Sequence, residues 1–472
     1  MKVLFVTSEA YPFAMSGGLA DVSGALPKAL KKRVVGCRVV MPLYDTVSDS
    51  LKDKMKFLFS YTVPVSWRRQ YCGVFEAKFD GVTYYLLDNQ YYFKRGSLYG
   101  HYDDAERFAF FSRAAIDLLK LIDFQPDVIH CNDWQSALVP VYMDLYYKPY
   151  DPFYSGIKTL LTIHNIQYQG IYSEDILEDV FGISRERMDI MGYEGCVNLL
   201  KAGIETADRI STVSPTYSRE ILTPDYAHGL DGILRAREYK LSSIVNGIDT
   251  EVYDPSTDSN IEKNYSVDSF DDKKINKLAL QKEMGLPERA EVPVISMVTR
   301  LVSHKGLDIV KYAIEDVLQR DVQLVILGSG DFEYESFFRY LKGKYPEKVG
   351  LKIGFIPALA RKIYAGSDIF LMPSLSEPCG LSQMIALRYG TVPITRETGG
   401  LKDTVIDSMN GKGNGFTFAN YNGDDLRFTI HRSIDAYADK DGWKILAKRC
   451  MECDNSWAKS ASDYIKLYKS MK

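Results

Sequence analysis

A glutamate follows a strongly apolar segment in the last third of the chain. Residues 368–374 (Asp-Ile-Phe-Leu-Met-Pro-Ser) have the continuous hydrophobic character of a strand covered on both faces, and residues 383–389 have a helical pattern. Glu377 therefore lies at the C-terminal end of a predicted parallel strand, where open α/β sheets bind their ligands. Taken alone, Glu377 is more simply explained as a residue that caps the next helix, so its neighbours must decide its function.

Cations and glycines follow the other predicted strands of this half. Arg300 and Lys305 lie in the loop after residues 292–298, from which both could reach a pyrophosphate and offset the charge of a leaving group without a metal. Taken alone, this pair could equally be two solvated surface charges. Glycine-containing loops at residues 328–331 and 398–403 follow two further strands. With a Gly-Gly loop in the first half, these make four loops with glycines or cations at corresponding strand ends, and they predict a nucleotide that lies against the second half of the chain.

The first half places polar residues in the same way. Gly17 and Gly18 follow the first predicted strand and precede a helix, which allows close approach of an anion. The segment is not GxGxxG, so it does not favour a dinucleotide, and a tight turn explains it as well as a phosphate loop does. Asp133 and His164 follow two more predicted strands. Their position predicts side chains that face a ligand and not the core.

Short apolar strands that alternate with helical patterns must position these residues. This alternation predicts doubly wound parallel sheets, and residues 71–87, which turn at Asp80-Gly81, predict an added antiparallel hairpin. The strands expected in the first half are residues 2–7, 37–41, 82–87, 127–130, 159–163, 209–213 and 242–245; those expected in the second half are residues 292–298, 322–327, 351–355, 368–372, 392–395 and 415–418.

The chain length of 472 residues exceeds what one hydrophobic core supports. We expect a Rossmann-like domain over residues 1–245 and a second over 246–452, with a cleft between them that closes about Asn246 when the nucleotide ligand binds. Residues 453–472 are expected to form a helix that crosses back to the first domain.

Composition excludes several classes of protein. The net charge of −4, without a block of Lys or Arg, does not fit a protein whose main ligand is nucleic acid. The seven scattered cysteines do not form a disulfide framework, and the single CxxC at residues 450–453 has no second pair to complete a zinc site. The first strand begins at once, without a signal peptide, and no apolar stretch reaches the ~20 residues that span a bilayer. We therefore expect a cytoplasmic protein.

Taken together, these segments resemble the bacterial glycogen synthase and plant starch synthase family of GT-B glycosyltransferases. Each motif alone is moderately specific, whereas their order and spacing over nearly the whole chain are highly specific. The motifs are Ser-Gly-Gly-Leu-Ala-Asp-Val at residues 16–22, Asn-Asp-Trp at 132–134, Thr-Ile-His-Asn at 162–165, Asn-Gly-Ile-Asp at 246–249, Arg300 with Lys-Gly-Leu-Asp at 305–308, Pro-Ser at 373–374 with Glu-Pro-Cys-Gly-Leu-Ser-Gln at 377–383, and Thr-Gly-Gly-Leu at 398–401.

The resemblance implies an α/β protein of GT-B fold, with two Rossmann-like domains whose parallel sheets face a central cleft. It implies transfer of glucose from a nucleotide sugar, ADP-glucose or else UDP-glucose, to the non-reducing end of an α-1,4-glucan such as glycogen or starch, with retention of configuration. The donor is a substrate, and no metal or other cofactor is expected. In a plant, the location would be the plastid stroma.

The resemblance also implies roles for individual residues. Arg300 and Lys305 would neutralise the diphosphate, Glu377 would hold the donor glucose and stabilise positive charge at the anomeric carbon, and His164 would position the sugar. The backbone N–H groups of Leu381 and Ser382 would meet phosphate, and Phe355 would stack on the base. The implied catalytic set is Glu377, His164, Arg300 and Lys305; the implied donor site is Gly17, Gly18, Asn246, Gly328, Phe355, Cys379, Gly380, Leu381, Ser382 and Thr398; the implied acceptor side is Asp21, Asp133, Trp134 and Asn165.

One position departs from the family pattern. The first glycine loop of the family normally begins with lysine, and here Met15 stands in its place. Loss of one charged hydrogen bond costs about 1.5 to 3 kcal/mol, or roughly one to two powers of ten in affinity or rate. A weakly active or non-catalytic glucan-binding paralogue is therefore an alternative to an active synthase. A third possibility keeps the GT-B fold but changes the reaction, as in a sucrose synthase or an epimerase.

Overall fold

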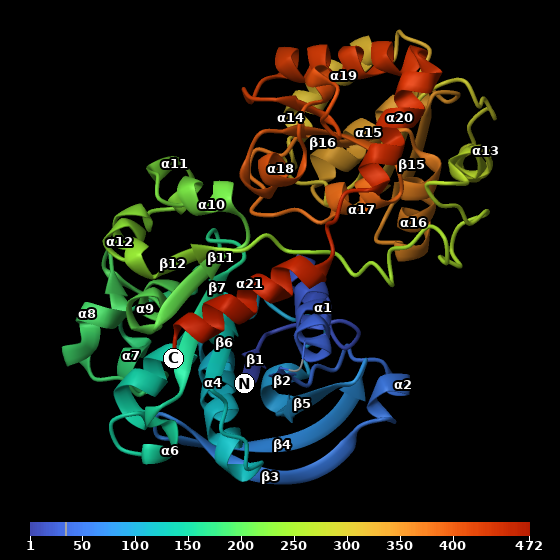
Figure 1. Ribbon diagram of the computed structural model, residues 1–472. Coiled ribbons are helices and arrows are strands. Elements are labelled where there is room, and N and C mark those ends of the chain that lie inside the picture. The colour runs from blue at the N-terminus through green and yellow to red at the C-terminus, as the bar shows by residue number, and fades with distance from the viewer. Residues whose placement is uncertain (34) are drawn as a thin grey trace. The chain divides into compact units, whose positions relative to one another are not determined.

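The computed structural model describes residues 1–33 and 35–472, which form two compact units (Figure 1). The first unit comprises Met1–Asn246 together with Trp457–Lys472, and the second comprises Gly247–Ser456. At the boundary of the second unit the outgoing and returning segments are joined, because the N–H of Ile248 donates to the carbonyl of Asn455 at 2.8 Å. Within the described residues, no helix combines the length and apolar character that crossing a membrane requires.

The first unit is built on a nine-stranded sheet with the order β12-β11-β7-β6-β1-β2-β5-β4-β3. The strands from β12 to β5 pair in parallel, whereas β4 pairs antiparallel with both β5 and β3. A separate small sheet has the order β8-β10-β9. The strands are β1 Lys2–Val6, β2 Gly36–Pro42, β3 Lys56–Val65, β4 Arg68–Phe79, β5 Val82–Asp88, β6 Val128–Asn132, β7 Lys158–Ile163, β8 Ile171–Tyr172, β9 Gly192–Tyr193, β10 Cys196–Asn198, β11 Arg209–Thr212 and β12 Leu241–Ser243.

Helices cover the parallel part of this sheet, and the chain's last helix, α21, packs beside α1 (Figure 1). The hydroxyl of Tyr468 on α21 bonds Nδ1 of His130 on β6 at 2.8 Å, so a buried polar contact adds to the aromatic packing there. The helices are α1 Gly18–Lys32, α2 Asp49–Lys52, α3 Gln90–Phe93, α4 Asp104–Leu121, α5 Leu138–Tyr142, α6 Pro152–Ser155, α7 Ile176–Asp179, α8 Met188–Met191, α9 Leu199–Thr206, α10 Pro215–Glu220, α11 Pro224–Ala227, α12 Asp231–Ala236 and α21 Trp457–Ser470.

The second unit has a six-stranded parallel sheet with the order β15-β14-β13-β16-β17-β18. Counted within the unit, this is the order 3-2-1-4-5-6 of a Rossmann domain, with its switch point between β13 and β16. The strands are β13 Val294–Val298, β14 Gln323–Gly328, β15 Val349–Ile353, β16 Ile369–Met372, β17 Val392–Arg396 and β18 Phe416–Phe418; the helices are α13 Lys273–Glu283, α14 Leu307–Val317, α15 Phe332–Lys344, α16 Pro357–Gly366, α17 Ser382–Arg388, α18 Gly399–Thr404, α19 Gly423–Ala438 and α20 Lys440–Met451.

The structure confirms the two doubly wound sheets and all thirteen predicted strands, with small shifts at their ends. The antiparallel hairpin is also confirmed, and its turn has positive φ at both Asp80 (47°) and Gly81 (76°), as a two-residue hairpin of type I′ requires. The sequence did not predict β3, which is the outermost strand of the first sheet. Its largely exposed or half-buried residues lack the continuous apolar run that marks the inner strands.

Candidate active site

The switch point of the second sheet brings together Lys305 and Glu377. Strands β13 and β16 are neighbours, and the loops that follow them carry these two residues. Nζ of Lys305 lies 2.6 Å from Oε2 of Glu377, and the hydroxyl of Ser374 donates to the same oxygen at 3.1 Å. The two charged side chains are only 15% and 10% exposed, so this ion pair is shielded from solvent.

Arg300 and His304 lie in the same loop as Lys305. Arg300 is exposed just after β13, and within the described parts of the chain none of the ion pairs includes it. Burial, with the charges of Lys305 and Arg300, lowers the pKa of His304 to about 4, so this imidazole is neutral at pH 7. His304 was not predicted as a site residue. The signal for it is its position between Arg300 and Lys305 in a strand-to-helix loop.

The glycines of these loops permit close backbone contact between neighbouring loops. A Cβ on Gly306 would lie 2.1 Å from the carbonyl oxygen of Pro373, and one on Gly328 would lie 2.0 Å from that of Thr299. The N–H of Gly400, which follows Thr398 in α18, donates to the carbonyls of Glu377 and Pro378 at 3.1 Å each. These glycines therefore hold the loops of Lys305 and Glu377 in contact with their neighbours.

Gln383 fixes the loop that leads from Glu377 to α17. Its Nε2 donates to the carbonyls of Cys379 (3.0 Å) and Gly380 (2.9 Å), and Gly380 has a φ of +73° that favours glycine. Cys379 is buried at 4% exposure. The loop thus ends with Leu381 and Ser382 at the start of α17.

Phe355 and Asn246 occupy contrasting environments. Strand β15 ends at Ile353, so Phe355 lies beyond it, and its ring is 81% exposed. An exposed aromatic ring at a sheet's C-terminal edge is free of core packing and can stack on a planar group. Asn246 is the last residue before the second unit and is 6% exposed.

The switch point of the first sheet lies between β1 and β6 and carries Asp133. Oδ1 of Asp133 accepts the N–H groups of His164 at 2.7 Å and Asn165 at 3.4 Å, which ties the end of β7 to the end of β6. Asp133 has a φ of +54°, a strained value for a residue that is not glycine. Burial raises the pKa of its carboxyl to about 7, and the charge of Glu9 adds to the increase.

The hydrogen bonds of His164 define its tautomer. Its Nε2 lies 2.9 Å from Oδ1 of Asn132, and the amide of Asn132 is oriented by donating from Nδ2 to the carbonyl of Val6 at 2.9 Å. Because an amide oxygen only accepts, Nε2 carries the proton and Nδ1 is the acceptor. Burial lowers the pKa of His164 to about 3, so the imidazole stays neutral at physiological pH.

The first glycine loop is closed by a residue that the sequence reasoning missed. The N–H of Ser16 donates to Oε2 of Glu9 at 2.5 Å, and the N–H of Gly17 also bonds this carboxylate. Gly17 has extended backbone with a φ of −164°, and a Cβ there would meet no atom within 4 Å. Met15 is 40% exposed. Neither φ nor internal packing therefore requires glycine at position 17, where the open space can receive a ligand.

The remaining residues predicted for the first unit lie in different environments. Gly18 begins α1, and Asp21 is in its first turn. Trp134 is only 8% exposed, and its ring packs against Phe108 and Tyr172. Its position in the structure is thus explained by core packing.

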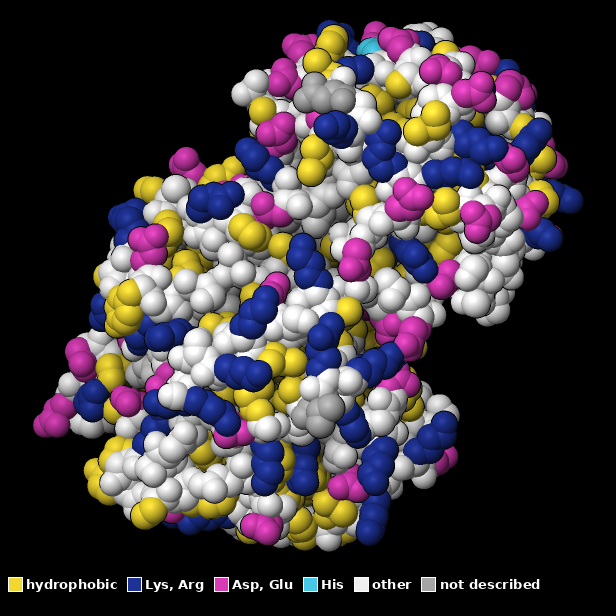
Figure 2. Space-filling model, viewed as in Figure 1, with side chains coloured by type: hydrophobic (Ala, Val, Ile, Leu, Met, Phe, Trp, Pro, Cys, Tyr) yellow, Lys and Arg dark blue, Asp and Glu magenta, His cyan; other side chains and the backbone are white. Residues whose placement is uncertain are grey.

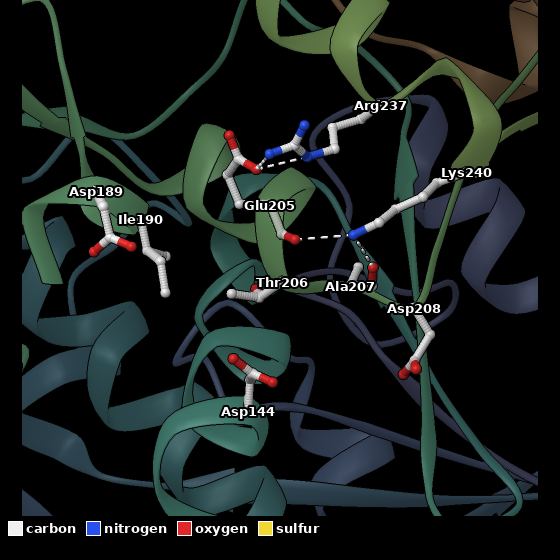
Figure 3. Close-up of a pocket in the computed structure, with 9 residues that line it drawn as sticks. All are labelled: Asp144, Asp189, Ile190, Glu205, Thr206, Ala207, Asp208, Arg237 and Lys240. Carbon is white, nitrogen blue, oxygen red and sulfur yellow. Dashed lines mark hydrogen bonds and ion pairs between the residues drawn. The ribbon is translucent and has the colours of Figure 1, made fainter.

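A cavity of about 590 Å³ in the first unit is lined by none of the predicted site residues (Figure 3). It borders Ala207 and Asp208 just before β11, at the N-terminal edge of the sheet. Its cations already have partners, because Arg237 pairs with Glu205 at 2.7 Å and Lys240 donates to the carbonyls of Glu205 and Ala207 at 2.9 Å each. We therefore assign this cavity no part in the chemistry at the opposite edge.

Charge and metal ligands can be surveyed over the described residues. Lys, Arg, Asp and Glu are intermixed on the visible face of each unit (Figure 2). Residues 1–33 and 35–472 contain no group of three or more His, Cys, Asp or Glu side chains placed to hold a metal ion.

Comparisons with known proteins assign the family. Residues 2–236 match the starch synthase catalytic domain, and residues 281–443 match glycosyl transferases group 1. The chain is 52% identical to a glycogen synthase of Clostridium perfringens over 100% of this chain and 98% of the relative, and 50% identical to that of Geobacillus thermodenitrificans over the same shares. The catalytic domain of starch synthase IV from Arabidopsis thaliana, bound to ADP and acarbose, superposes with a TM-score of 0.93 at 33% identity over 99% of both chains. The chain thus belongs to the glycogen and starch synthase family of GT-B glycosyltransferases, enzymes that transfer glucosyl units to a glucan.

Proposed function

We propose that this enzyme transfers glucose from ADP-glucose to the non-reducing end of an α-1,4-glucan with retention of configuration. The observation that carries the proposal is the shielded pair of Lys305 and Glu377 at the switch point of the second sheet. A cation and a carboxylate side by side can serve a substrate that becomes negative at its leaving group and positive at its anomeric carbon. ADP in the related starch synthase structure supports adenine as the base.

Arg300 and Lys305 serve the leaving diphosphate. The exposed guanidinium of Arg300 can form the bidentate contacts that phosphate favours. Lys305 is held by Glu377, so its ammonium is already oriented before the donor arrives. With two cations on one loop, the proposed reaction requires no metal or other cofactor for neutralisation of the diphosphate.

Glu377 and His164 serve the sugar. Glu377 accepts hydrogen bonds from donor hydroxyls and stabilises positive charge at the anomeric carbon. Neutral His164 offers Nδ1 as an acceptor for a sugar hydroxyl, since its Nε2 proton is committed to Asn132.

The other assignments follow the architecture of each unit. In the second unit, the N–H groups of Leu381 and Ser382 bind phosphate, and the exposed ring of Phe355 stacks on the base. In the first unit, Asp21, Asp133 and Asn165 belong to the acceptor side, and Trp134 supports them through its packing.

A donor panel tests the proposal. Purified enzyme would receive radiolabelled ADP-glucose, UDP-glucose or GDP-glucose with glycogen as acceptor, with and without EDTA. We expect the label to enter glycogen fastest from ADP-glucose, at a rate that EDTA does not change. An exo-acting α-1,4-glucosidase should then release the incorporated label as glucose. Equal or faster transfer from UDP-glucose would overturn the assignment of the base, and no transfer from any donor would overturn the function.

Met15 gives one specific reason to consider the weakly active or non-catalytic glucan-binding alternative. It replaces the family's lysine with an exposed thioether that carries no charge. Met15→Lys should raise kcat/KM for the donor by roughly ten- to one-hundred-fold if position 15 contacts the donor. An inert protein that binds glycogen and stays inert after this substitution would favour the non-catalytic alternative.

A further inference from the structure

The carboxylate of Glu9 fills the glycine loop of the first unit. Glu9 follows β1, is 3% exposed, and accepts hydrogen bonds from the N–H of Ser16, the N–H of Gly17 and the hydroxyl of Ser16. Successive backbone N–H groups before a helix form a ready site for an anion. Here the anion is supplied by the chain itself.

The backbone around Glu9 holds the carboxylate in this place. The hydroxyl of Thr7 donates to the carbonyl of Glu9 at 2.8 Å and lies 2.9 Å from the hydroxyl of Ser23 on α1. The hydroxyl of Ser8 lies 2.7 Å from that of Tyr99. Since both residues before Glu9 are anchored by buried hydroxyl groups, a change at Glu9 acts mainly on the loop that it binds.

The charge of Glu9 is stabilised by dipoles without a cation. Over the described residues, none of the ion pairs includes Glu9. The titratable groups that face it are Asp21 on α1, Asp133 after β6, Tyr44 after β2 and Tyr99 before α4. Burial, opposed by the hydrogen bonds of Ser16 and Gly17 and assisted by the charge of Asp21, raises the pKa of Glu9 to about 7.

We propose that Glu9 is a positioning residue for glucosyl transfer: its ionised carboxylate holds residues 15–18 in the conformation that receives the donor, and its protonation releases this loop. The proposal rests on the transfer reaction proposed above. It also means that the N–H groups of Ser16 and Gly17 serve Glu9 and are not available for phosphate. The loop would then contribute its shape and the open space beside Gly17.

The residue at position 15 also bears on the ionisation of Glu9. A lysine at position 15 would add a cation to the residue next to Ser16, whose N–H Glu9 binds. An opposite charge favours the ionised form of a carboxyl. With Met15, the ionised form of Glu9 depends on the loop's own donors, and the enzyme loses activity at a higher pH than it would with lysine.

Hydrogen exchange tests the loop without any assay of activity. In Glu9→Gln one acceptor oxygen replaces a carboxylate that takes three hydrogen bonds, so the amides of residues 16 and 17 should exchange roughly ten- to one-hundred-fold faster at pH 8. The matched control is Asp117→Asn on α4, because burial also raises the pKa of Asp117 but its carboxylate bonds Tyr147 at 2.6 Å. The control should exchange as wild type does. Equal protection of residues 16 and 17 in wild type and Glu9→Gln would overturn the proposal.

The pH dependence of kcat/KM for ADP-glucose provides the second test. We expect the wild-type value to fall below about pH 7, where Glu9 and Asp133 take up protons. In Glu9→Gln the value at pH 8 should be roughly ten- to one-hundred-fold lower. The fall of kcat/KM at low pH that remains in Glu9→Gln, its acid limb, should lie at lower pH than in wild type, because Asp133 no longer faces a charged Glu9. Met15→Lys should also move the limb to lower pH, whereas Asp117→Asn should leave it in place.

The outcomes separate the two proposals. No transfer by wild type at any pH would overturn the proposed function, whereas exchange at residues 16 and 17 would still report on Glu9. An active wild type whose acid limb is unchanged by Glu9→Gln and by Met15→Lys would overturn the role of Glu9 alone.

Discussion

Two buried glutamates stand at the switch points of the two sheets, and they are stabilised in different ways. Glu377 has the ammonium of Lys305 at 2.6 Å and the hydroxyl of Ser374 at 3.1 Å. Glu9 has backbone and hydroxyl donors, and the charged groups that face it are themselves carboxyls. The comparison teaches that a switch point can hold a carboxylate either through a cation or through the dipoles of N–H and O–H groups.

The glycines near the two glutamates differ in how closely the surrounding backbone packs against them. A Cβ on Gly400 would lie 2.3 Å from the carbonyl oxygen of Cys379, whereas one on Gly17 would meet nothing within 4 Å. The loops of the second unit are locked by mutual backbone contact. In the loop of the first unit, the N–H groups of Ser16 and Gly17 are bound by a side chain, that of Glu9, and a backbone bridge joins Ala10 and Ala14 just before them.

The largest effect should come from removing the cation of the second site. Lys305→Met leaves Glu377 shielded from solvent without its partner and removes a charge aimed at the leaving group, so kcat should fall by about 10² to 10³-fold. Steady-state kinetics with ADP-glucose measure this, and Glu377→Gln in the same background should recover thermal stability but not kcat. A loss no greater than that of Glu9→Gln would contradict the proposed distinction between the two glutamates.

The next largest effect should come from adding a methyl group at Gly400, with Gly17 as the comparison. Gly400→Ala forces a methyl group against the backbone of Cys379 and should destabilise the second unit by about 1–3 kcal/mol or more. Gly17→Ala should change stability by less than about 0.5 kcal/mol, because its methyl group points into open space, but it should raise KM for the donor. Differential scanning calorimetry of both variants is the measurement. Equal shifts in melting temperature would show that both loops are locked by the same kind of contact.

Much of the fold and of the second unit's site could be predicted from the sequence, because a continuous apolar run marks a buried strand and the residues after it lie at the strand's end. Continuous apolar runs located the parallel strands, and the residues that follow them, Lys305 and Glu377, do meet in the structure. The edge strand β3 escaped prediction, since Ser60, Thr62 and Pro64 interrupt its apolar residues and leave no continuous apolar run of the kind that located the inner strands. The sequence predicts the Gly-Gly pair at residues 399–400 as part of a nucleotide loop, and the structure adds a packing reason, since these glycines lie against the backbone of Glu377 and Cys379.

Glu9 could not be predicted because its partners depend on how the chain turns after β1. No periodic pattern relates Glu9 to the N–H of Ser16 seven residues later, and a backbone N–H leaves no mark in the sequence. Asp133 was predicted as a site residue from its place after a strand, but its bond to the backbone of His164 was not, because it forms only once β6 and β7 are neighbours. His304 could have been found, since it lies between two residues already selected.

The smallest effect concerns stability, and it opposes the effect on activity. The pKa of Glu9 in the folded state, about 7, lies above its ordinary value of 4.5, so the folded state binds the proton more tightly than the unfolded state does. The stabilisation from this proton is fully present below pH 4.5 and is lost as pH rises through about 7, with a total of at most about 3 kcal/mol. The first unit should therefore melt several degrees higher at pH 6 than at pH 8, while transfer is slower at pH 6. The test compares this difference in melting temperature between variants. Glu9→Gln should reduce the difference, whereas Asp117→Asn should keep the part of it that is due to Glu9. A difference that is the same in wild type and Glu9→Gln would show that Glu9 does not take up a proton in this range, and would contradict the raised pKa of its carboxyl.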